Sequence, residues 1–201
     1  ERDIELCRAA GVKFLLGHYV RSVDELKSMG FEAVVLCPGA MKPASLRLKY
    51  GGSINALEFL KSFKAMPGGL RIGKNVAVVG GGNTAVDAAR AALRVPGVES
   101  VFLVYRRTRR YMPAFREELE QALNEGVKLY ELLSPVGVRD GVLECRKTVL
   151  GEPDADGRLR PVETAETVKI PADTVIAAVG ERIDSDFFAS NGIEIDGGGR
   201  P

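Results

Sequence analysis

The segment VVGGGNTA at residues 78–85 constrains the fold more than any other part of this 201-residue sequence. Its Gly80, Gly82 and Ala85 form a G-x-G-x-x-A pattern, which follows the apolar run NVAVVG and opens an alanine-rich, helix-like stretch at 83–94. The pattern demands a tight turn at its first position, a backbone without a Cβ at its second and close helix–strand packing at its third. The sequence therefore predicts a strand–turn–helix unit of a parallel α/β sheet here.

A helix that begins at such a turn presents unpaired N–H groups and the positive end of its dipole, and both attract phosphate oxygens. We therefore expect the pyrophosphate of a dinucleotide to bind at this turn. The residues expected to form this part of the site are Gly80, Gly81, Gly82, Asn83, Thr84 and Ala85. The alternative is that the glycines serve only to make a tight turn between strand and helix.

The end of the next apolar run, SVFLVYR, indicates which dinucleotide binds. Sites for NAD usually carry an acidic residue about 20 residues beyond the third glycine-motif position, against the ribose 2′-hydroxyl. Here that count reaches Tyr105, which Arg106 and Arg107 follow. A carboxylate would repel a 2′-phosphate, whereas a guanidinium binds one through two N–H groups. The sequence therefore favours NADP over NAD.

The basic run RRTRR continues with Arg109 and Arg110, whose role has two interpretations. They either cover the adenosine phosphate or belong to an exposed basic loop. A basic run also raises nucleic-acid binding, but the chain carries 28 basic and 27 acidic residues, for a net charge of +1. Since no aromatic residues are interleaved on a basic face, we expect no nucleic-acid partner.

The first 40 residues read as two helices and two strands. An opening helix ends near Gly11, and VKFLLG at 12–17 is expected to be a short strand. The segment SVDELKSMG begins with a capping-box pattern and predicts a helix over 22–30. FEAVVLCPGA, at 31–40, predicts a buried strand that runs into a Pro-Gly turn.

From residue 54 onward, helical and strand patterns alternate. Helices are expected at about 54–65, 83–94 and 113–125, with strands between them, which predicts a parallel sheet with crossover helices. Between about 134 and 170, turns at Asp140-Gly141 and Asp156-Gly157 predict a three-stranded antiparallel meander. ADTVIAAVGE then returns as a buried strand. The expected fold class is α/β, a Rossmann-like parallel sheet plus this meander.

Few side chains are suited to acid–base or metal chemistry. The three cysteines, Cys7, Cys37 and Cys145, lie far apart without a C-x-x-C pair, and the single histidine is His18. This spacing predicts no metal site and is typical of a reducing, cytoplasmic compartment. No apolar run approaches the about 20 residues that a membrane-spanning helix needs, so we expect no membrane partner. No nucleophile–base pair stands out, as expected for hydride transfer, in which the cofactor carries the reacting atoms.

Three segments together resemble a known family. They are VAVVGGGNTAVDAARAA, VFLVYRRTRRYMPA with the following EELEQALNEGV, and PADTVIAAVGE. They look like the pyridine-nucleotide domain of glutamate synthase small-subunit-type flavoproteins, and VVLCPGA and IAAVGE look like the two short linkers of that fold. The run from RAALR to YMP and the segment LGEPDADGR are most similar to the branch named for selenate reductase flavoprotein subunits.

The resemblance implies an FAD domain that is interrupted by an inserted NADPH domain. NADPH would pass hydride to FAD, and electrons would move through iron–sulfur clusters to a partner subunit or domain. On this basis residues 1–52 are the end of the first FAD-domain segment with its linker, 53–175 the NADPH-binding domain and 176–201 the start of the returning FAD-domain segment. Val179 and Gly180, at the second linker, would lie near the nicotinamide.

The sequence departs from the family pattern in what it lacks. The FAD fingerprint, the Gly-Asp flavin segment and the cluster-binding cysteines are not among these residues, and Cys37 stands where the first linker usually has Thr or Ala. We therefore expect a central piece of a longer protein, with its FAD-binding and iron–sulfur segments elsewhere in that protein or in a partner subunit. Alone, it is expected to bind no FAD and turn over no substrate.

Two classes of function stay open at this point. The chain is either the NADPH-binding module of a flavin-dependent oxidoreductase or a non-catalytic NADP(H)-binding module for sensing or assembly. The second reading rests on the lack of a nameable catalytic side chain, because a fold by itself does not determine function.

Overall fold

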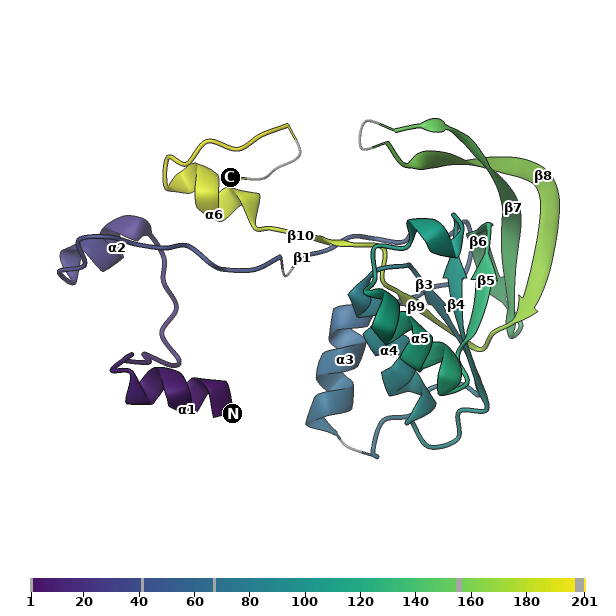
Figure 1. The fold of residues 1–201 in the computed structure, drawn as a ribbon, viewed down its shortest axis with the longest axis horizontal. Helices are drawn as coiled ribbons and strands as arrows, with labels where there is room; N and C mark the ends of the chain where they lie inside the picture. The colour runs from purple at the N-terminus through teal and green to yellow at the C-terminus, as the bar shows by residue number, and fades with distance from the viewer. Residues whose placement is uncertain (1, 41, 67, 155–156, 198–200) are drawn as a thin grey trace. The chain divides into compact units, whose positions relative to one another are not determined.

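The computed structural model describes all residues except 1, 41, 67, 155–156 and 198–200. The chain divides into two compact units (Figure 1). One unit is Lys42–Arg182, and the other combines Glu1–Met41 with Ile183–Pro201. We describe each by itself.

A five-stranded sheet forms the centre of the Lys42–Arg182 unit, and each neighbouring pair of its strands is parallel. In spatial order the strands are β2 (Ile54–Asn55), β9 (Thr174–Ala177), β3 (Asn75–Val79), β4 (Ser100–Tyr105) and β5 (Lys128–Glu131). Val78 of β3 is in register with Ile176 on one side and Leu103 on the other. All three side chains are fully buried, so the hydrophobic core runs through the middle of the sheet.

One face of the sheet is covered by helices α3 (Ala56–Ala65), α4 (Asn83–Leu93) and α5 (Arg116–Asn124) (Figure 1). The alanine-rich sequence of α4 explains its central place. Ala85, Ala88, Ala89 and Ala92 have no exposed surface, and their small side chains let the helix lie close to the strands. The helices predicted at 54–65, 83–94 and 113–125 are thus confirmed, although α5 begins after Pro113 rather than at it.

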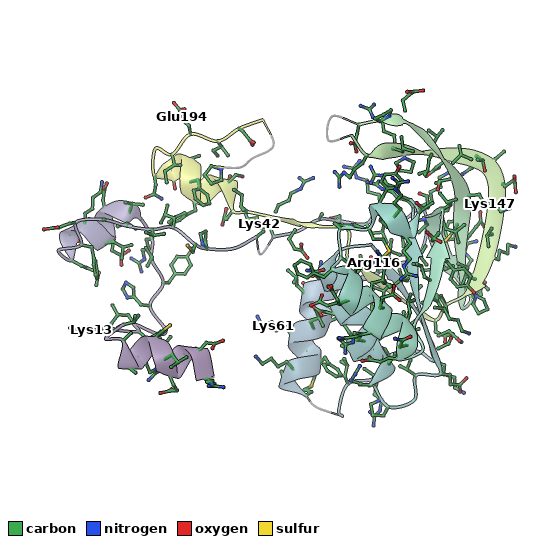
Figure 2. All side chains as sticks on the ribbon, viewed as in Figure 1. Lys13, Lys42, Lys61, Arg116, Lys147 and Glu194 are labelled. Atoms are coloured by element: carbon green, nitrogen blue, oxygen red, sulfur yellow. The ribbon has the colours of Figure 1, made fainter. Side chains whose placement is uncertain are left out.

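The opposite face packs against an antiparallel sheet of β6 (Leu133–Arg139), β7 (Val142–Pro153) and β8 (Leu159–Pro171). Ala77 and Phe102 of the parallel sheet meet Leu143 and Ile170 of this meander in a second core. Charged side chains such as Lys147 on β7 point outward from it (Figure 2). The predicted fold class, a parallel sheet with crossover helices plus a three-stranded meander, is confirmed.

The first turn of the meander has the conformation predicted for it. Asp140 and Gly141 both have positive φ, 51° and 72°, as a two-residue hairpin turn requires. In the second turn Gly157 has a φ of 73°, while Asp156 lies outside the described residues. At the edge of the unit, β1 (Lys42–Pro43) pairs antiparallel with β10 (Glu181–Arg182), which joins the two connecting segments.

The unit formed by the two ends of the chain contains the short helices α1 (Arg2–Ala9), α2 (Val23–Ser28) and α6 (Ser185–Ser190). Ser22 caps α2 by accepting the N–H of Glu25 at 3.1 Å, as the capping pattern predicts. The Glu25 carboxylate accepts the Arg21 N–H, which with His18 holds the pKa of Glu25 below its usual value. His18 therefore has a structural partner in this unit.

The two strands predicted in this unit, at 12–17 and 31–40, are wrong. Both segments are irregular, and Leu16 and Val35 are 80% and 86% exposed. A strand forms only where a neighbouring strand accepts and donates its backbone hydrogen bonds. Among the described residues no strand lies beside either segment, so an apolar sequence alone does not produce a strand here.

A cluster of one acidic and two basic side chains joins α4 to the end of α5, and it predicts a dependence of stability on pH. Arg90 and Arg94 bind Glu125 with N–O distances of 2.5 and 3.1 Å and lower the pKa of its carboxyl to about 2. Because the folded pKa lies below the ordinary value of 4.5, this stabilisation is complete above pH 4.5 and is lost as the pH falls towards 2.

Glu125→Gln should therefore flatten the fall of the urea midpoint between pH 5 and 2. Glu117→Gln is the matched control, because Glu117 is an exposed carboxylate of α5 without an ion-pair partner in the described part of the chain. Equal acid dependence for the parent and Glu125→Gln would contradict the assignment.

Candidate functional site

The glycine turn is held between the ends of two neighbouring strands. Gly80 has a φ of +149°, and a Cβ added there would lie 2.2 Å from the carbonyl oxygen of Ala178, just beyond β9. On the other side, the Gly80 N–H donates to the Val104 carbonyl of β4 at 3.1 Å. The first position of the motif therefore accepts only glycine.

The second glycine of the turn lies on an aromatic ring. A Cβ at Gly81 would approach Cε2 of Tyr105 to 2.5 Å, so the turn rests directly on this side chain. The Tyr105 hydroxyl donates to the Tyr111 carbonyl at 2.7 Å, which fixes the ring. Tyr105 is thus part of the framework of the site.

The third glycine is the N-cap of α4 and supplies no side-chain cap. A Cβ at Gly82 would have a single neighbour within 4 Å, the Pro113 side chain at 4.0 Å, so the backbone is open on this side. Within the described residues, the N–H groups of Gly82, Asn83 and Thr84 donate to no protein acceptor. An unsatisfied helix start with an open backbone is a site for an anion.

Asn83 and Ala85 support the turn rather than line a cavity. The Asn83 side chain accepts the N–H of Phe115 at 2.8 Å, and the Gly81 carbonyl accepts the N–H of Ala114 at 3.1 Å. These bonds attach the MPA segment at 112–114 to the glycine turn. Ala85 is fully buried and packs α4 against β3, as the motif requires.

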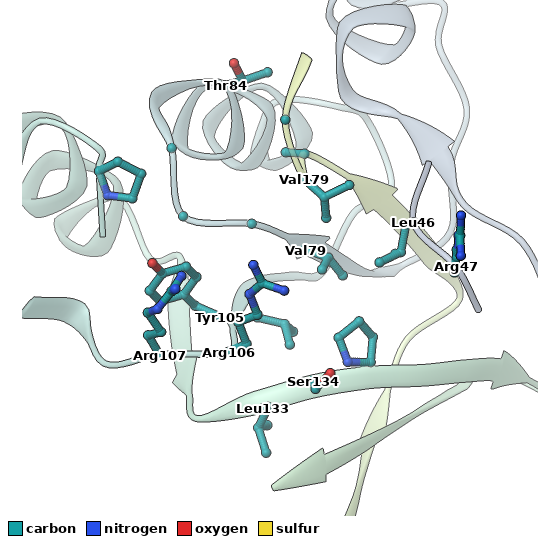
Figure 3. A pocket seen from close by; sticks show the side chains of 18 of the residues that line it. Leu46, Arg47, Val79, Thr84, Tyr105, Arg106, Arg107, Leu133, Ser134 and Val179 are labelled. Carbon is teal, nitrogen blue, oxygen red and sulfur yellow. The ribbon is translucent and has the colours of Figure 1, made fainter. Parts of the chain in front are cut away.

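A cavity of about 540 Å³ opens beside the turn, within the Lys42–Arg182 unit (Figure 3). The predicted site residues that line it are Gly80, Gly81, Gly82, Thr84, Arg106, Arg107, Val179 and Gly180. Other lining residues, which the sequence did not single out, include Leu46, Arg47, Ser134, Pro135, Arg158, Glu163 and Glu181. A volume of this size is typical of small-molecule and cofactor sites.

The two arginines at the end of β4 have different surroundings. Arg106 is exposed and faces the cavity (Figure 3), and its guanidinium has no partner among the described residues. Arg107 is only 7% exposed. It donates to the Leu159 carbonyl at 2.8 Å and to the Asp154 carboxylate at 3.1 Å, so its guanidinium is bound by the β7–β8 hairpin.

The next two arginines lie in and beside the short 3₁₀ helix η1 (Arg109–Tyr111). Arg109 pairs with Glu120 of α5, and its N–H donates to Glu131, so it stabilises the loop. Arg110 is exposed, does not line the cavity and has no ion-pair partner in the described chain. The structure thus separates two residues that the sequence could not distinguish.

The opposite end of the cavity is formed by the connecting segment after β9. Val179 is 39% exposed, and Gly180, with a φ of +120°, accepts the Ala44 N–H through its carbonyl at 2.9 Å. Glu181, which follows Gly180, also lines the cavity. Cys145 does not line the cavity, and burial raises the pKa of its thiol to about 12, which keeps it protonated.

The geometry combines a helix start whose N–H groups have no protein acceptor in the described chain with an exposed guanidinium that lines the same cavity. The model of one family, described as pyridine nucleotide-disulphide oxidoreductase, matches residues 3–201. The chain belongs to the pyridine nucleotide-disulphide oxidoreductase family. Its glycine turn carries the G-x-G-x-x-A pattern that is typical of dinucleotide-binding folds.

Curated relatives are longer oxidoreductases or their subunits. The Escherichia coli K12 protein YgfK, named as an oxidoreductase, is 44% identical over 206 residues, covering 100% of this chain and 20% of its own. The NADPH-Fe(3+) oxidoreductase subunit beta of Geobacter sulfurreducens is 39% identical over 215 residues, covering 97% of this chain and 31% of its own. The NADP(+)-dependent formate dehydrogenase subunit beta of Moorella thermoacetica is 36% identical over 200 residues, covering 92% and 28%. The chain thus spans about a fifth to a third of these relatives.

Solved structures share the fold. Mycobacterium tuberculosis FprA in complex with NADPH superposes with a TM-score of 0.65 at 20% identity, covering 80% of this chain and 52% of that one. Thioredoxin reductase of T. acidophilum gives a TM-score of 0.52 at 16% identity, covering 78% and 48%. At this identity the likeness establishes the architecture only.

Two classes of feature are absent from the described residues. They contain no group of three or more His, Cys, Asp or Glu side chains placed to hold a metal ion. They also contain no helix that is long and apolar enough to cross a membrane.

Sequence reasoning missed the residues that act through contacts distant in the chain. Tyr105 under the glycine turn and Arg158 at the hairpin tip are the clearest cases. The position of Tyr105, directly before the arginine pair, was a usable signal for the first. For Arg158 there was none, because its place depends on how the hairpin folds back.

Proposed function

We propose that this chain is the NADPH-binding module of a flavin-dependent oxidoreductase. NADPH bound at the glycine turn would supply a hydride to FAD that other segments of the protein hold. The observation that carries the proposal is Arg106, an unpaired, exposed guanidinium that lines the same cavity as the open start of α4.

The residues present fit a dinucleotide. The N–H groups of Gly82, Asn83 and Thr84 point from the start of α4 without a protein acceptor in the described chain, which suits the pyrophosphate oxygens. The open side of Gly82 gives the phosphate room to approach the backbone. Gly80 and Gly81 shape the turn, and Ala85 holds α4 against the sheet.

The roles proposed for the remaining residues follow from their places around the cavity. Arg106 would bind the 2′-phosphate, and Arg107, whose guanidinium is engaged by Asp154 and Leu159 of the hairpin, would hold that hairpin beside it. Arg110 would cover the adenosine phosphate from outside the cavity. Val179 and Gly180, which line the cavity, would lie at the nicotinamide end.

The names of the relatives support a cofactor-binding role for the shared segment. One is an NADPH-Fe(3+) oxidoreductase subunit, another an NADP(+)-dependent formate dehydrogenase subunit, and a third the glutamate synthase [NADPH] small chain of Escherichia coli. Their other reactants differ, whereas NADP(H) appears in all three names. The part that they share with this chain is therefore best explained as the NADP(H) end of the reaction.

We further propose that residues 1–52 and 176–201 belong to the FAD domain, with 53–175 as the inserted NADPH domain. Iron–sulfur and FAD-binding segments of the full-length protein or a partner subunit would complete the electron path. Nucleotide binding without flavin reduction in the full-length protein would instead favour a sensing or assembly module.

The proposal is tested by titrating the chain with NADPH and NADH and following nicotinamide fluorescence. The parent should prefer NADPH, and Arg106→Ala should weaken NADPH binding by roughly 1.5–3 kcal/mol, the scale of hydrogen bonds to a charged group. NADH binding should change little, because NADH has no 2′-phosphate.

Arg116→Ala is the control for a general loss of positive charge. Arg116 is exposed at the start of α5 and does not line the cavity. Equal affinity of the parent for both nucleotides, or no selective loss in Arg106→Ala, would refute the NADP assignment.

A further inference from the structure

The hairpin between β7 and β8 contributes to the wall of the nucleotide cavity. Arg158, at the tip of this hairpin, lines the cavity together with Arg106, which comes from the end of β4. The two guanidinium groups belong to elements about 50 residues apart in the sequence. Nothing in the glycine pattern or in the arginine pair specifies this second cation.

Arg107 is attached to the hairpin by two hydrogen bonds. Its Nε donates to the Leu159 carbonyl at 2.8 Å and its Nη2 to the Asp154 carboxylate at 3.1 Å. The Arg107 side chain is 9% exposed, and the Asp154 carboxylate neutralises its charge. A side chain that is buried and bonded in this way holds Asp154 and Leu159 of the hairpin beside the end of β4.

Asp154 in turn binds Arg158 through both backbone and side chain. Its Oδ1 accepts the Arg158 N–H at 2.8 Å, while its own N–H donates to the Arg158 carbonyl at 2.8 Å. Its Oδ2, which binds Arg107, also lies 3.8 Å from Nε of Arg158. The backbone and the side chain of Arg158 are therefore both placed by the residue that Arg107 holds.

The acidic side chain in this wall lies away from the tip. Glu163 is five residues further along the chain from Arg158, and its carboxylate accepts the Ser134 hydroxyl at 2.8 Å and lies 3.8 Å from Arg146. The tip thus presents Arg158 to the cavity, and the Arg107 charge behind it is balanced by Asp154.

We infer that Arg158 is the second cation that recognises the 2′-phosphate and that Arg107 is a positioning residue acting through Asp154. This inference rests on the proposed function and names the residues that would make the site prefer NADPH to NADH. A phosphate monoester would be bound from two directions, by Arg106 of the sheet and Arg158 of the hairpin. A ribose with a free 2′-hydroxyl offers neither of them an anionic partner.

The test measures dissociation constants of the full chain for NADPH, NADH and 2′,5′-ADP. Arg158→Ala should raise the values for NADPH and 2′,5′-ADP about tenfold, the lower end for a hydrogen bond to a charged group, and change that for NADH less than twofold. Arg160→Ala is the matched control, since Arg160 is an exposed residue of β8, two positions further along the chain, that does not line the cavity. Equal effects of the two substitutions would overturn the role of Arg158.

The positioning role of Arg107 is tested by the preference for NADPH over NADH, which a purely structural role of Arg107 would leave unchanged. Asp154→Asn and Arg107→Ala should each lower the NADPH preference over NADH, and Arg107→Ala should add nothing to Arg158→Ala in the double variant. Additive losses would show that Arg107 itself contacts the phosphate, which would overturn its positioning role. Circular dichroism confirms that each variant is folded.

The experiments distinguish failure of the Arg158 inference from failure of the proposed NADPH-binding function. If Arg106→Ala reduces NADPH binding selectively and Arg158→Ala does not, the hairpin inference fails and the NADPH module stands. If neither substitution affects the NADPH preference, the proposed function fails with it.

Discussion

Replacing Gly80 with alanine is expected to destabilise the Lys42–Arg182 unit by about 3 kcal/mol or more, the combined scale of a strained backbone and an overpacked core. The Gly80 φ of +149° is one that L side chains rarely adopt. The new Cβ would also lie 2.2 Å from the Ala178 oxygen and 2.9 Å from its carbonyl carbon, which are backbone atoms at the end of β9. Relief would require β3 and β9 to separate at the centre of the sheet.

The measurement is the free energy of unfolding in urea, followed by circular dichroism. Gly52→Ala is the matched control, because a Cβ at Gly52 meets nothing within 4 Å and its φ is not in the left-handed region. If Gly80→Ala unfolds at the same urea concentration as Gly52→Ala, the close approach of this turn to β9 is not as described.

Gly82→Asp is expected to preserve or raise stability and to abolish dinucleotide binding. The Gly82 backbone, with φ −90° and ψ 177°, is extended and suits any residue, and aspartate is a favoured N-cap that would accept the free N–H groups of α4. The same carboxylate would occupy the place proposed for the pyrophosphate. Two negative charges about 4 Å apart near a protein surface repel each other by about 4 kcal/mol.

We therefore expect both NADPH and NADH to bind at least about 100-fold more weakly to Gly82→Asp. Gly82→Asn is the control, because it caps the helix with a similar shape and no charge, and its loss should be smaller. The equal effect on the two nucleotides separates this variant from Arg106→Ala, which should affect NADPH alone. Unchanged binding by Gly82→Asp would place the pyrophosphate elsewhere.

Sequence patterns predicted the elements of the Lys42–Arg182 unit well, because local preference and tertiary packing agree there. The alanines of α4 are both good helix formers and small enough to lie on the sheet. Asp140-Gly141 allows the positive φ values that its turn needs. Where the same residues favour both the local conformation and the tertiary packing, the sequence pattern predicts the structure reliably.

The strand predictions at 12–17 and 31–40 failed for the converse reason. An apolar run is compatible with a strand, but it becomes one only when another segment lies beside it and pairs with its backbone N–H and C=O groups. The arginine pair shows the same limit for the site. Arg106 and Arg107 are adjacent and chemically identical, yet one faces the cavity and the other is buried against the hairpin.

The sequence by itself determined the strand–turn–helix at Gly80–Ala85, the meander and the absence of an acid after β4, since each depends on neighbouring residues and their spacing. Only the tertiary structure decided which arginine is free, what supports the glycine turn and that Arg158 shares the cavity with Arg106. These features depend on contacts between segments far apart in the chain. Such contacts are set by the packing of the layers, so the local sequence pattern does not predict them.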